Sequence, residues 1–391
     1  MSIHRRLVAG LVGLTLLFGC ERATENPVDA EIRPHWQPVA LPMPEGPAGR
    51  LMLRDAVACA DRWYLVGAVG GPDGATRPAV WTSTDALTWS TVRLAPSSYY
   101  GERAILYAAG CRDGRIAVIG AKAGGAHGNP RVRTWRQLPD GSLVEVSAEF
   151  ELYGGPRAVN VSRVAGGPGG WLIAGGRESG AAVWRSPDAA DFRIVENAPG
   201  LASDAGVRTS ATDALAVPDG WLVGGSGRAE GRPDHDPLLW TSPDGLAWTR
   251  TALPATGEDE AVQRLARVGD SVLALGLRGG TFGAWRLDGT DPGGWQAAGR
   301  FGVAGAGAIA GVEAVTTYGG HVLAVSVAAD GHRLWRSDGA ARQWSGVALP
   351  VDVPPGGDTA ASVAAMAGQA VMITDDGHGA RAWQAAFPGT P

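Results

Sequence analysis

Residues 239–248 read Leu-Trp-Thr-Ser-Pro-Asp-Gly-Leu-Ala-Trp, which is a strand-like run, a tight turn and the start of a second run. Residues 80–89 repeat this unit as Val-Trp-Thr-Ser-Thr-Asp-Ala-Leu-Thr-Trp, and shorter versions occur at 183–192 and 334–339. The first tryptophan of the unit recurs seven times, at Trp81, Trp135, Trp184, Trp240, Trp285, Trp335 and Trp383. Because a recurring period of about fifty residues is the signature of a repeat fold, we expect seven units.

Each unit has the pattern of four short strands. Before Trp240, small and apolar residues alternate up to a turn at Pro218-Asp219-Gly220, and a short apolar run then ends at Gly224. Such runs, bounded by Gly, Pro and Asp, are typical of strands. Four antiparallel strands in about fifty residues describe a propeller blade. The repeats therefore predict an all-β fold, a seven-bladed β-propeller of four-stranded antiparallel blades.

The two ends of the chain suggest how the ring closes. The seventh unit has too few residues after Trp383 for an outer strand. Residues 36–42, Trp-Gln-Pro-Val-Ala-Leu-Pro, match the outer strand of the sixth unit at 344–350, Trp-Ser-Gly-Val-Ala-Leu-Pro. We expect the N-terminal strand to complete the last blade, which removes an exposed sheet edge. Residues 35–391 then form a single propeller.

Residues 1–19 have the order of a secretory signal. His4, Arg5 and Arg6 form a basic start, and the apolar run over 7–18 is too short for a permanent membrane span. No later stretch is apolar enough to span a bilayer.

The end of this segment, Leu17-Phe18-Gly19-Cys20, resembles the bacterial lipobox. That resemblance implies cleavage before Cys20 and acylation of Cys20, so that membrane lipid is a partner and no transmembrane segment is needed. The polar residues 20–34 read as a flexible tether. We therefore expect a lipoprotein anchored to the bacterial cell envelope on its extracytoplasmic side, periplasmic or at the cell surface.

Composition narrows the partners. The chain has 59 glycines, 26 prolines and a net charge of −5, which argues against nucleic acid. Apart from Cys20, the cysteines are Cys59 and Cys111. In an oxidising compartment this pair is a disulfide candidate, since both residues lie where the first strand turns toward the second in adjacent units. Two buried free thiols are the alternative.

The fifteen tryptophans repeat at fixed places in the units. Seven lie in third strands. Five belong to outer strands, namely Trp36, Trp89, Trp248, Trp295 and Trp344, and three belong to second strands, namely Trp63, Trp171 and Trp221. A large indole at a repeated position favours packing between neighbouring blades over an aromatic platform for sugar.

The turn of the unit resembles the Asp-box of sialidase-like β-propellers, Ser-x-Asp-x-Gly-x-Thr-Trp, with one residue fewer between Asp and Trp. The full Ser/Asp/Trp set is kept at Ser83 and Ser242. Ser and Asp side chains can accept hydrogen bonds from backbone N–H groups within such a turn. The resemblance implies the fold and places these residues at the periphery, away from a site on the ring axis.

Function is expected in the other loops, which emerge around the channel mouth. Arg50, Arg103, Arg157 and Arg208 each enter an innermost strand, in units one to four. Guanidinium groups in a concave mouth suit a carboxylate or phosphate, so these residues, with Tyr99, Tyr153 and Glu102, form the predicted ligand site. Alternatively, the arginines pair with Glu102, Asp204 or Asp55, or face solvent.

These features favour a non-enzymatic binding or scaffold module, a monomer whose partner is an anionic small molecule, a glycan or another envelope protein. The alternative is a glycan-directed hydrolase or lectin, in which Tyr99 or Tyr153 beside Glu102 or Glu151 would imitate the sialidase nucleophile pair. The Arg-Ile-Pro motif of sialidases is absent.

A metal-binding accessory protein is the third hypothesis. It rests on four histidines that we expect in loops joining second to third strands, His127, His235, His332 and His378. These lie on four different blades, and we expect no cofactor and no resident metal.

Overall fold

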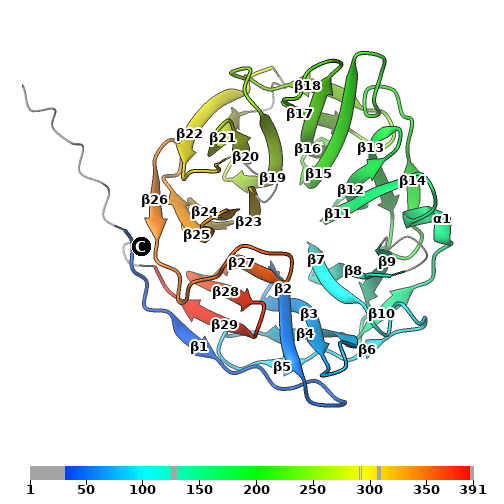
Figure 1. Cartoon of the computed structure of the whole chain (residues 1–391), viewed down its shortest axis with the longest axis vertical. Helices are drawn as coiled ribbons and strands as arrows, with labels where there is room; N and C mark the ends of the chain where they lie inside the picture. The colour runs from blue at the N-terminus through cyan, green and yellow to red at the C-terminus, as the bar shows by residue number, and fades with distance from the viewer. Residues whose placement is uncertain (1–30, 125–129, 290, 292, 306–309, 388–391) are drawn as a thin grey trace, which may run out of the picture. The chain divides into compact units, whose positions relative to one another are not determined.

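The computed structural model describes residues 31–387, except 125–129, 290, 292 and 306–309. The signal segment, Cys20 and His127 lie outside the described residues. Seven four-stranded antiparallel sheets form the blades of a β-propeller, as the repeats predict (Figure 1). Blade 2 carries one extra short strand, β6 (Leu94–Ala95), which pairs in parallel with the outer strand of that blade.

Blades 1 to 4 follow one another along the chain. Blade 1 comprises β2 (Arg50–Cys59), β3 (Arg62–Gly70), β4 (Thr76–Ser83) and β5 (Ser90–Thr91). Blade 2 comprises β7 (Ile105–Arg112), β8 (Arg115–Lys122), β9 (Arg131–Gln137) and β10 (Leu143–Val146). Blade 3 comprises β11 (Ala158–Gly167), β12 (Gly170–Arg177), β13 (Gly180–Ser186) and β14 (Arg193–Val195). Blade 4 comprises β15 (Val207–Val217), β16 (Gly220–Ala229), β17 (Asp236–Ser242) and β18 (Thr249–Ala252).

Blades 5 to 7 complete the ring. Blade 5 comprises β19 (Glu260–Val268), β20 (Ser271–Arg278), β21 (Thr281–Asp288) and β22 (Gln296–Phe301). Blade 6 comprises β23 (Gly311–Tyr318), β24 (His321–Ala328), β25 (Gly331–Ser337) and β26 (Trp344–Val347). Blade 7 comprises β27 (Thr359–Met366), β28 (Gln369–Asp376), β29 (Ala380–Ala385) and β1 (Gln37–Val39). The described helix is one short turn, α1 (Phe150–Tyr153), before blade 3.

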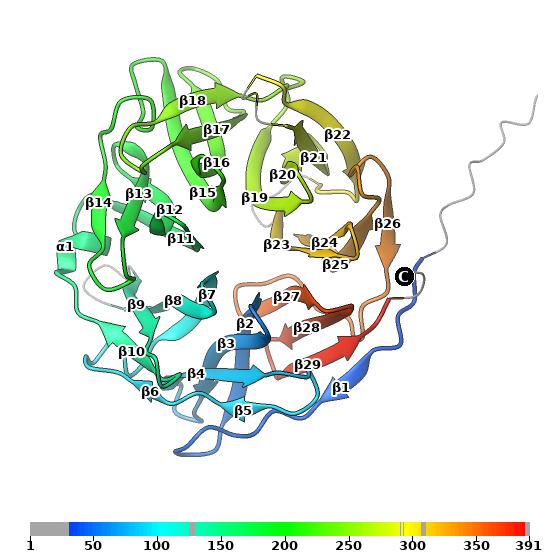
Figure 2. The same ribbon diagram turned by 180° about the vertical axis from the view of Figure 1, so that it is seen from behind.

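The predicted closure by the N-terminal strand is confirmed. β1 pairs antiparallel with β29, with Gln37 opposite Gln384 and Val39 opposite Ala382. The chain makes an earlier contact as well, because Ile32 forms a parallel bridge with Val347 of blade 6. In both axial views the first strand of each blade lies innermost, so these strands line the channel (Figures 1 and 2).

Apolar packing holds the ring together. In the part of the chain that the structure describes, buried apolar side chains form seven clusters, and each cluster joins two adjacent blades. The cluster between blades 7 and 1, for example, contains Leu53, Trp81 and Ile373, all fully buried. Since burying one such side chain contributes about 1.5–3 kcal/mol, each interface between blades is a substantial part of the core.

In blades 1, 3, 4 and 5 the repeated tryptophan also ties the blade to the segment that enters it. Four third-strand indoles donate their N–H groups to main-chain carbonyls of that segment: Trp81 to Pro42, Trp184 to Leu152, Trp240 to Gly200 and Trp285 to Pro254, at 2.6–2.8 Å. These tryptophans are fully buried. This confirms that the indoles pack structurally between strands and blades.

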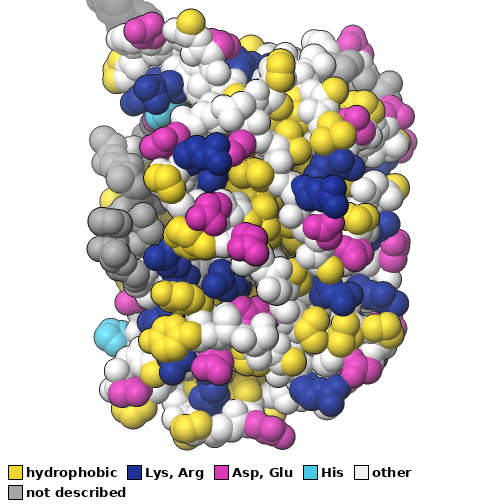
Figure 3. Space-filling view, turned by 90° about the vertical axis from the view of Figure 1, so that its right-hand side faces the viewer, with side chains coloured by type: hydrophobic (Ala, Val, Ile, Leu, Met, Phe, Trp, Pro, Cys, Tyr) yellow, Lys and Arg dark blue, Asp and Glu magenta, His cyan; other side chains and the backbone are white. Residues whose placement is uncertain are grey.

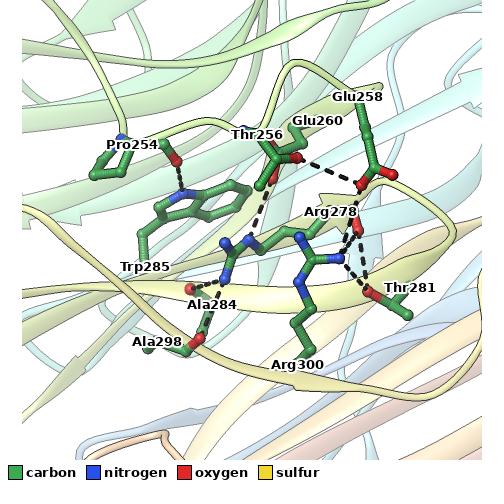
Figure 4. A network of polar contacts seen from close by, with 10 residues as sticks. All are labelled: Pro254, Thr256, Glu258, Glu260, Arg278, Thr281, Ala284, Trp285, Ala298 and Arg300. Atoms are coloured by element: carbon green, nitrogen blue, oxygen red, sulfur yellow. Dashed lines mark hydrogen bonds and ion pairs between the residues drawn. The ribbon is translucent and has the colours of Figure 1, made fainter.

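Blade 5 adds a buried ion pair to this arrangement (Figure 4). Arg278 Nε lies 3.3 Å from Glu260 Oε1, and the two side chains are 5% and 0% exposed. The guanidinium carbon stands 5.1 Å from the centre of the Trp285 ring, while Thr256 N–H donates to the second Glu260 oxygen at 2.6 Å. Because every member has a partner, we interpret this network as structural.

The turns between third and outer strands are built around aspartate. In blade 1, Asp85 Oδ1 accepts the backbone N–H groups of Leu87 and Thr88 at 2.9 and 2.7 Å, and Ser83 Oγ donates to the same oxygen. These hydrogen bonds, that of Thr88 first, lower the pKa of Asp85 to about 2. The next residue, Ala86, has a positive φ of 61°, which is the strained position that glycine fills in the turn of blade 4.

Cys59 and Cys111 form a disulfide, as predicted, with a Cα–Cα distance of 5.4 Å. The bond joins the end of β2 to β7 and so links the inner strands of blades 1 and 2. The outer wall near α1 and β14 carries positive and negative side chains intermixed with apolar ones (Figure 3). No described helix is long and apolar enough to cross a bilayer.

Candidate ligand site in the central channel

A β-bulge interrupts the first strand of each of blades 1 to 6. At one level of the ring the register shifts at Arg54, Tyr107, Ser162, Thr212, Gln263 and Glu313, and β11 has a second shift at Val159. The six bulged residues at this common level are polar, although their strands are otherwise rich in small and apolar residues. Bulges redirect side chains and leave backbone groups unpaired, so this level of the channel is where polar chemistry collects.

Asp55, just after the bulge of blade 1, joins four blades. Its Oδ2 lies 2.7 Å from Arg163 Nη1 of blade 3 and accepts the N–H of Ala109 in blade 2 at 3.1 Å. Its Oδ1 accepts the hydroxyl of Ser362 in blade 7 at 3.0 Å. Asp55 is 5% exposed. Both carboxylate oxygens are therefore engaged in cross-blade contacts.

Two arginines stand side by side next to this residue. Arg163 Nη2 and Arg264 Nε donate to the same acceptor, the main-chain carbonyl of Glu313, at 2.8 and 2.7 Å. Arg264 Nη1 also donates to the carbonyl of Gln263 at 2.6 Å. In the described part of the chain, Arg163 has an ion pair with Asp55, whereas Arg264 has no carboxylate within 4.0 Å.

The pKa values of these two arginines are shifted in opposite directions. Burial, and then the positive charge of Arg163, lower the pKa of Arg264 to about 10. Burial also opposes the charge of Arg163, but Asp55, Asp213 and Glu313 outweigh it and raise the pKa of Arg163. Of the two arginines, Arg264 is therefore the one whose charge the neighbouring carboxylates compensate less.

Asp213 occupies in blade 4 the place that Asp55 has in blade 1. Its Oδ2 accepts the N–H of Leu265 in the next blade and its Oδ1 that of Ala214, both at 2.9 Å. Asp213 is 9% exposed, and burial raises the pKa of its carboxyl despite the nearby Arg264 and Arg163. The environment of Asp213 thus raises the proton affinity of its carboxyl.

Glu313 closes the site from blade 6. Its carboxylate lies 3.0 Å from His332 Nε2, and the buried His332 ring also contacts the carbonyl of Val353 through Nδ1 at 3.2 Å. A cavity of about 380 Å³ opens beside these groups. Its polar lining is Tyr107, Ser162, Arg163, Thr212, Gln263, Arg264 and Glu313, so the bulged residues of five blades face one space.

Comparison with known proteins supports the fold. No family model matches the chain, and no curated protein matches it. Among solved structures it is similar to the β-propeller domain of the Trilobed protease from Pyrococcus furiosus, with 12% identity over 87% of this chain and 96% of that one and a TM-score of 0.50. That structure is described as having an open velcro topology.

Two further neighbours are longer enzymes. A puromycin-hydrolyzing peptidase of Mycobacterium tuberculosis is 13% identical over 88% of this chain and 52% of that one, with a TM-score of 0.54. A sialidase of Trypanosoma rangeli is 10% identical over 91% and 59%, with a TM-score of 0.46. The chain spans little more than half of either protein. At 13% identity, the likeness to the peptidase establishes the β-propeller fold alone.

The residues of the predicted mouth site lie in separate places. Arg103 pairs with Glu102 at 2.9 Å and stacks 4.0 Å from the centre of the exposed Tyr99 ring, so these three residues are together. Arg50 pairs instead with the buried Asp375 at 3.0 Å, and Arg157 pairs with Glu196 at 2.9 Å.

The remaining predicted residues lie elsewhere again. Arg208 lines a cavity at blades 3 and 4 that shares no residue with the channel cavity. Tyr153 is buried against Trp184, with its hydroxyl 3.4 Å from Thr134 Oγ1, and burial raises its pKa. No carboxylate contacts the hydroxyl of Tyr99 or Tyr153 within the described residues.

One histidine assignment was wrong. His332 lies in the third strand β25 and not in the loop before it, because the connection from β24 is a tight turn. His235 pairs with Asp259 at 2.8 Å. Across the ranges that the structure describes, no group of three or more His, Cys, Asp or Glu side chains is arranged to hold a metal ion.

The sequence did contain a signal for the channel site. Each polar bulged residue lies nine positions before the second residue of the following strand, namely Trp63, Ile116, Trp171, Trp221, Val272 and Val322 in order. A polar residue at one fixed place in six repeats indicates a ring of side chains at one level. The predicted mouth site was based instead on the arginines where the first strands begin, which lie at a different level of the same strands.

Proposed function

We propose that this chain is a ligand-binding β-propeller that takes a small carboxylate-bearing molecule in its central channel. The observation that carries the proposal is the environment of Arg264. Its half-buried guanidinium lies beside a second arginine, Arg163, and Arg264 itself has no ion pair with a carboxylate among the described residues. Two cations held together repel each other, and a bound anion relieves that repulsion. Arginine pairs are well suited to carboxylates because their N–H groups match both oxygens.

The rest of the lining favours a hydroxylated ligand such as an acidic sugar. The cavity of about 380 Å³ is within the usual range for small-molecule sites. Tyr107, Ser162, Thr212 and Gln263 supply hydroxyl and amide groups around the arginine pair. The Tyr107 hydroxyl donates to the carbonyl of Val161 at 2.7 Å, which leaves its oxygen able to accept a hydrogen bond from a ligand.

The proposal can be tested with D-glucuronate as the ligand and D-glucose as the uncharged control. Glucuronate should raise the melting temperature, glucose should not, and the effect should fade in high salt. Arg264→Gln should abolish the glucuronate effect. Arg193→Gln is the matched control, since Arg193 is an exposed arginine on an outer strand.

Two results would overturn this proposal. One is that glucuronate at about 10 mM leaves the melting temperature unchanged, which would place any affinity below the range of a useful site. The other is an equal loss of the effect in Arg264→Gln and Arg193→Gln, which would mean that the anion responds to net charge and not to the channel.

The proposed setting is the bacterial cell envelope, where acylated Cys20 would hold the propeller at an extracytoplasmic membrane surface. The support is the sequence Leu17-Phe18-Gly19-Cys20. Cys20→Ser should release a soluble, unacylated protein. Mass spectrometry of the mature wild-type N-terminus would reject the anchor if it finds no acyl chain.

Hydrolysis of a glycan is the second candidate, favoured by the raised pKa of Asp213 beside the arginine pair. A carboxyl with a raised pKa is better suited than an ordinary one to act as a general acid. This candidate predicts release of methylumbelliferone from 4-methylumbelliferyl glucuronide and loss of that release in Asp213→Asn. Binding of glucuronate without turnover supports the binding module.

A further inference from the structure

A second cavity lies at blades 3 and 4, on the face where first strands begin and second strands end. It has a volume of about 590 Å³ and shares no residue with the channel cavity. Six charged residues line it: Glu178, Asp204, Arg208, Arg228, Glu230 and Arg232. They come from β15, β16, the β12–β13 turn and the loops that flank β15 and follow β16.

Two of these six charges are neutralised by neighbours outside the cavity. Arg232 lies 3.0 Å from Asp236. Asp204 lies 2.8 Å from Arg250, and its other oxygen accepts the N–H groups of Gly206 and Val207. These contacts hold the walls of the cavity in place. Arg232 and Asp204 each have an ion-pair partner already, so neither is a free charge in the cavity.

The other four charges are left without ion pairs. Within the described residues, neither Arg208 nor Arg228 has a carboxylate within 4.0 Å, and neither Glu178 nor Glu230 has a cation within that distance. All four residues are exposed, so the cavity presents to solvent two cations and two anions that form no ion pair with one another.

The two arginines are held next to each other by the sheet. Arg208 in β15 is directly opposite Arg228 in β16. Residues in this relation have Cβ atoms about 5 Å apart, and like charges there are destabilising. An anionic group between the two guanidinium groups would turn this repulsion into two charge-assisted contacts.

The two glutamates are attached to backbone that is itself fixed. Glu178 N–H donates to the carbonyl of Arg157 at 3.0 Å, and Glu230 N–H donates to the carbonyl of Gly206 at 3.0 Å. Ser203 N–H donates to the carbonyl of Ser179 at 2.8 Å across the cavity wall. The backbone that carries the unpaired charges is therefore ordered before a ligand arrives, which lowers the cost of binding.

We propose that this cavity binds a small zwitterion, with its phosphate or carboxylate between Arg208 and Arg228 and its ammonium group at Glu178 and Glu230. A ligand with both groups satisfies all four charges at once. A simple anion satisfies only the arginines and brings its own charge near two carboxylates. The site is distinct from the proposed channel site in its residues and in the charge of its ligand.

The experiment compares whole zwitterions with their halves by calorimetric titration. The probes are O-phosphoethanolamine, β-alanine, inorganic phosphate and ethanolamine. At least one of the two zwitterions should bind about tenfold or more tightly than either phosphate or ethanolamine, which are the separate charged groups. Phosphoethanolamine binding alone identifies a phosphate as the anion, and β-alanine binding alone identifies a carboxylate.

The variants assign the two ends of the ligand. Arg208→Gln with Arg228→Gln should weaken zwitterion binding about tenfold or more. Glu178→Gln with Glu230→Gln should leave the zwitterion no tighter than its anionic half. Arg193→Gln with Arg381→Gln is the control, because it makes the same change of net charge outside the cavity. Arg264→Gln should leave zwitterion binding intact, which separates this site from the channel.

Three outcomes would overturn the zwitterion site. These are the absence of binding by both zwitterions at about 10 mM, halves that bind as tightly as the whole molecules, or an equal loss in the control double variant. The comparison of wild-type protein with whole and half ligands decides the matter even if one of the variants does not fold.

Discussion

Removal of the Cys59–Cys111 bond should lower stability by an amount that follows from the chain it closes. The two cysteines are 52 residues apart. In the chain-entropy account, closing a loop of this length in the unfolded state is worth about 4 kcal/mol. Unfolding entropy of about 2.1 cal/mol/K per residue amounts to about 0.75 kcal/mol/K for a cooperative propeller of this length. The expected fall in melting temperature is therefore about 5 °C.

The assay is calorimetric melting of the oxidised protein, of the reduced protein and of Cys59→Ala with Cys111→Ala. Cys59 is 1% exposed, so alanine is preferred to serine because it adds no buried hydroxyl group. Reduction breaks the bond without replacing either side chain, so the reduced protein is an independent check on the double variant. A reductant should have no effect on the double variant. Melting temperatures within about 1 °C for the oxidised and reduced protein would refute the entropic argument.

Three other perturbations test the fold and the channel. Asp55→Asn removes the charge partner of the half-buried Arg163 and should cost about 3 kcal/mol in urea unfolding, an expectation that an unchanged midpoint would contradict. Deletion through residue 41 removes β1 and should lower the melting temperature and promote aggregation, whereas deletion of residues 21–30 should not; equal melting temperatures would show that β1 is dispensable. Asp85 should titrate near pH 2 by NMR, and because its folded pKa lies below the unfolded value, the stability it adds above about pH 4 should disappear as the pH falls toward 2, while Asp85→Asn should lack this dependence.

The fold could be predicted from the sequence because a large residue recurs at a fixed place in every repeat. Tryptophan at one place in each of seven units marks the third strands, and its burial between blades explains why that residue recurs. The match between the segment at Trp36 and that at Trp344 predicted closure, since a ring needs both ends of the chain in one sheet. Strand pairing of this kind follows from local pattern and needs no knowledge of side-chain contacts.

The channel site was harder to predict because its geometry is not local. Asp55 meets Arg163 from two blades away, and Glu313 offers its carbonyl to arginines of blades 3 and 5. Period-2 alternation assigns side chains to faces of a strand, but a bulge shifts that assignment by one residue. Six bulges at the same place therefore moved the polar residues to positions that strict alternation does not indicate.

The N-terminal contacts of the ring are arranged in series along the chain. Ile32 pairs with Val347 of blade 6 before β1 pairs with β29 of blade 7. A mechanical load that draws the N-terminal end away from the ring therefore meets the single Ile32 bridge first. It then acts on Trp36, whose indole N–H donates to the carbonyl of Ala348, and on β1 from Gln37 toward Val39, one residue pair at a time. Tension would be released by peeling one short strand, while the other three strands of blade 7 keep their own ladders.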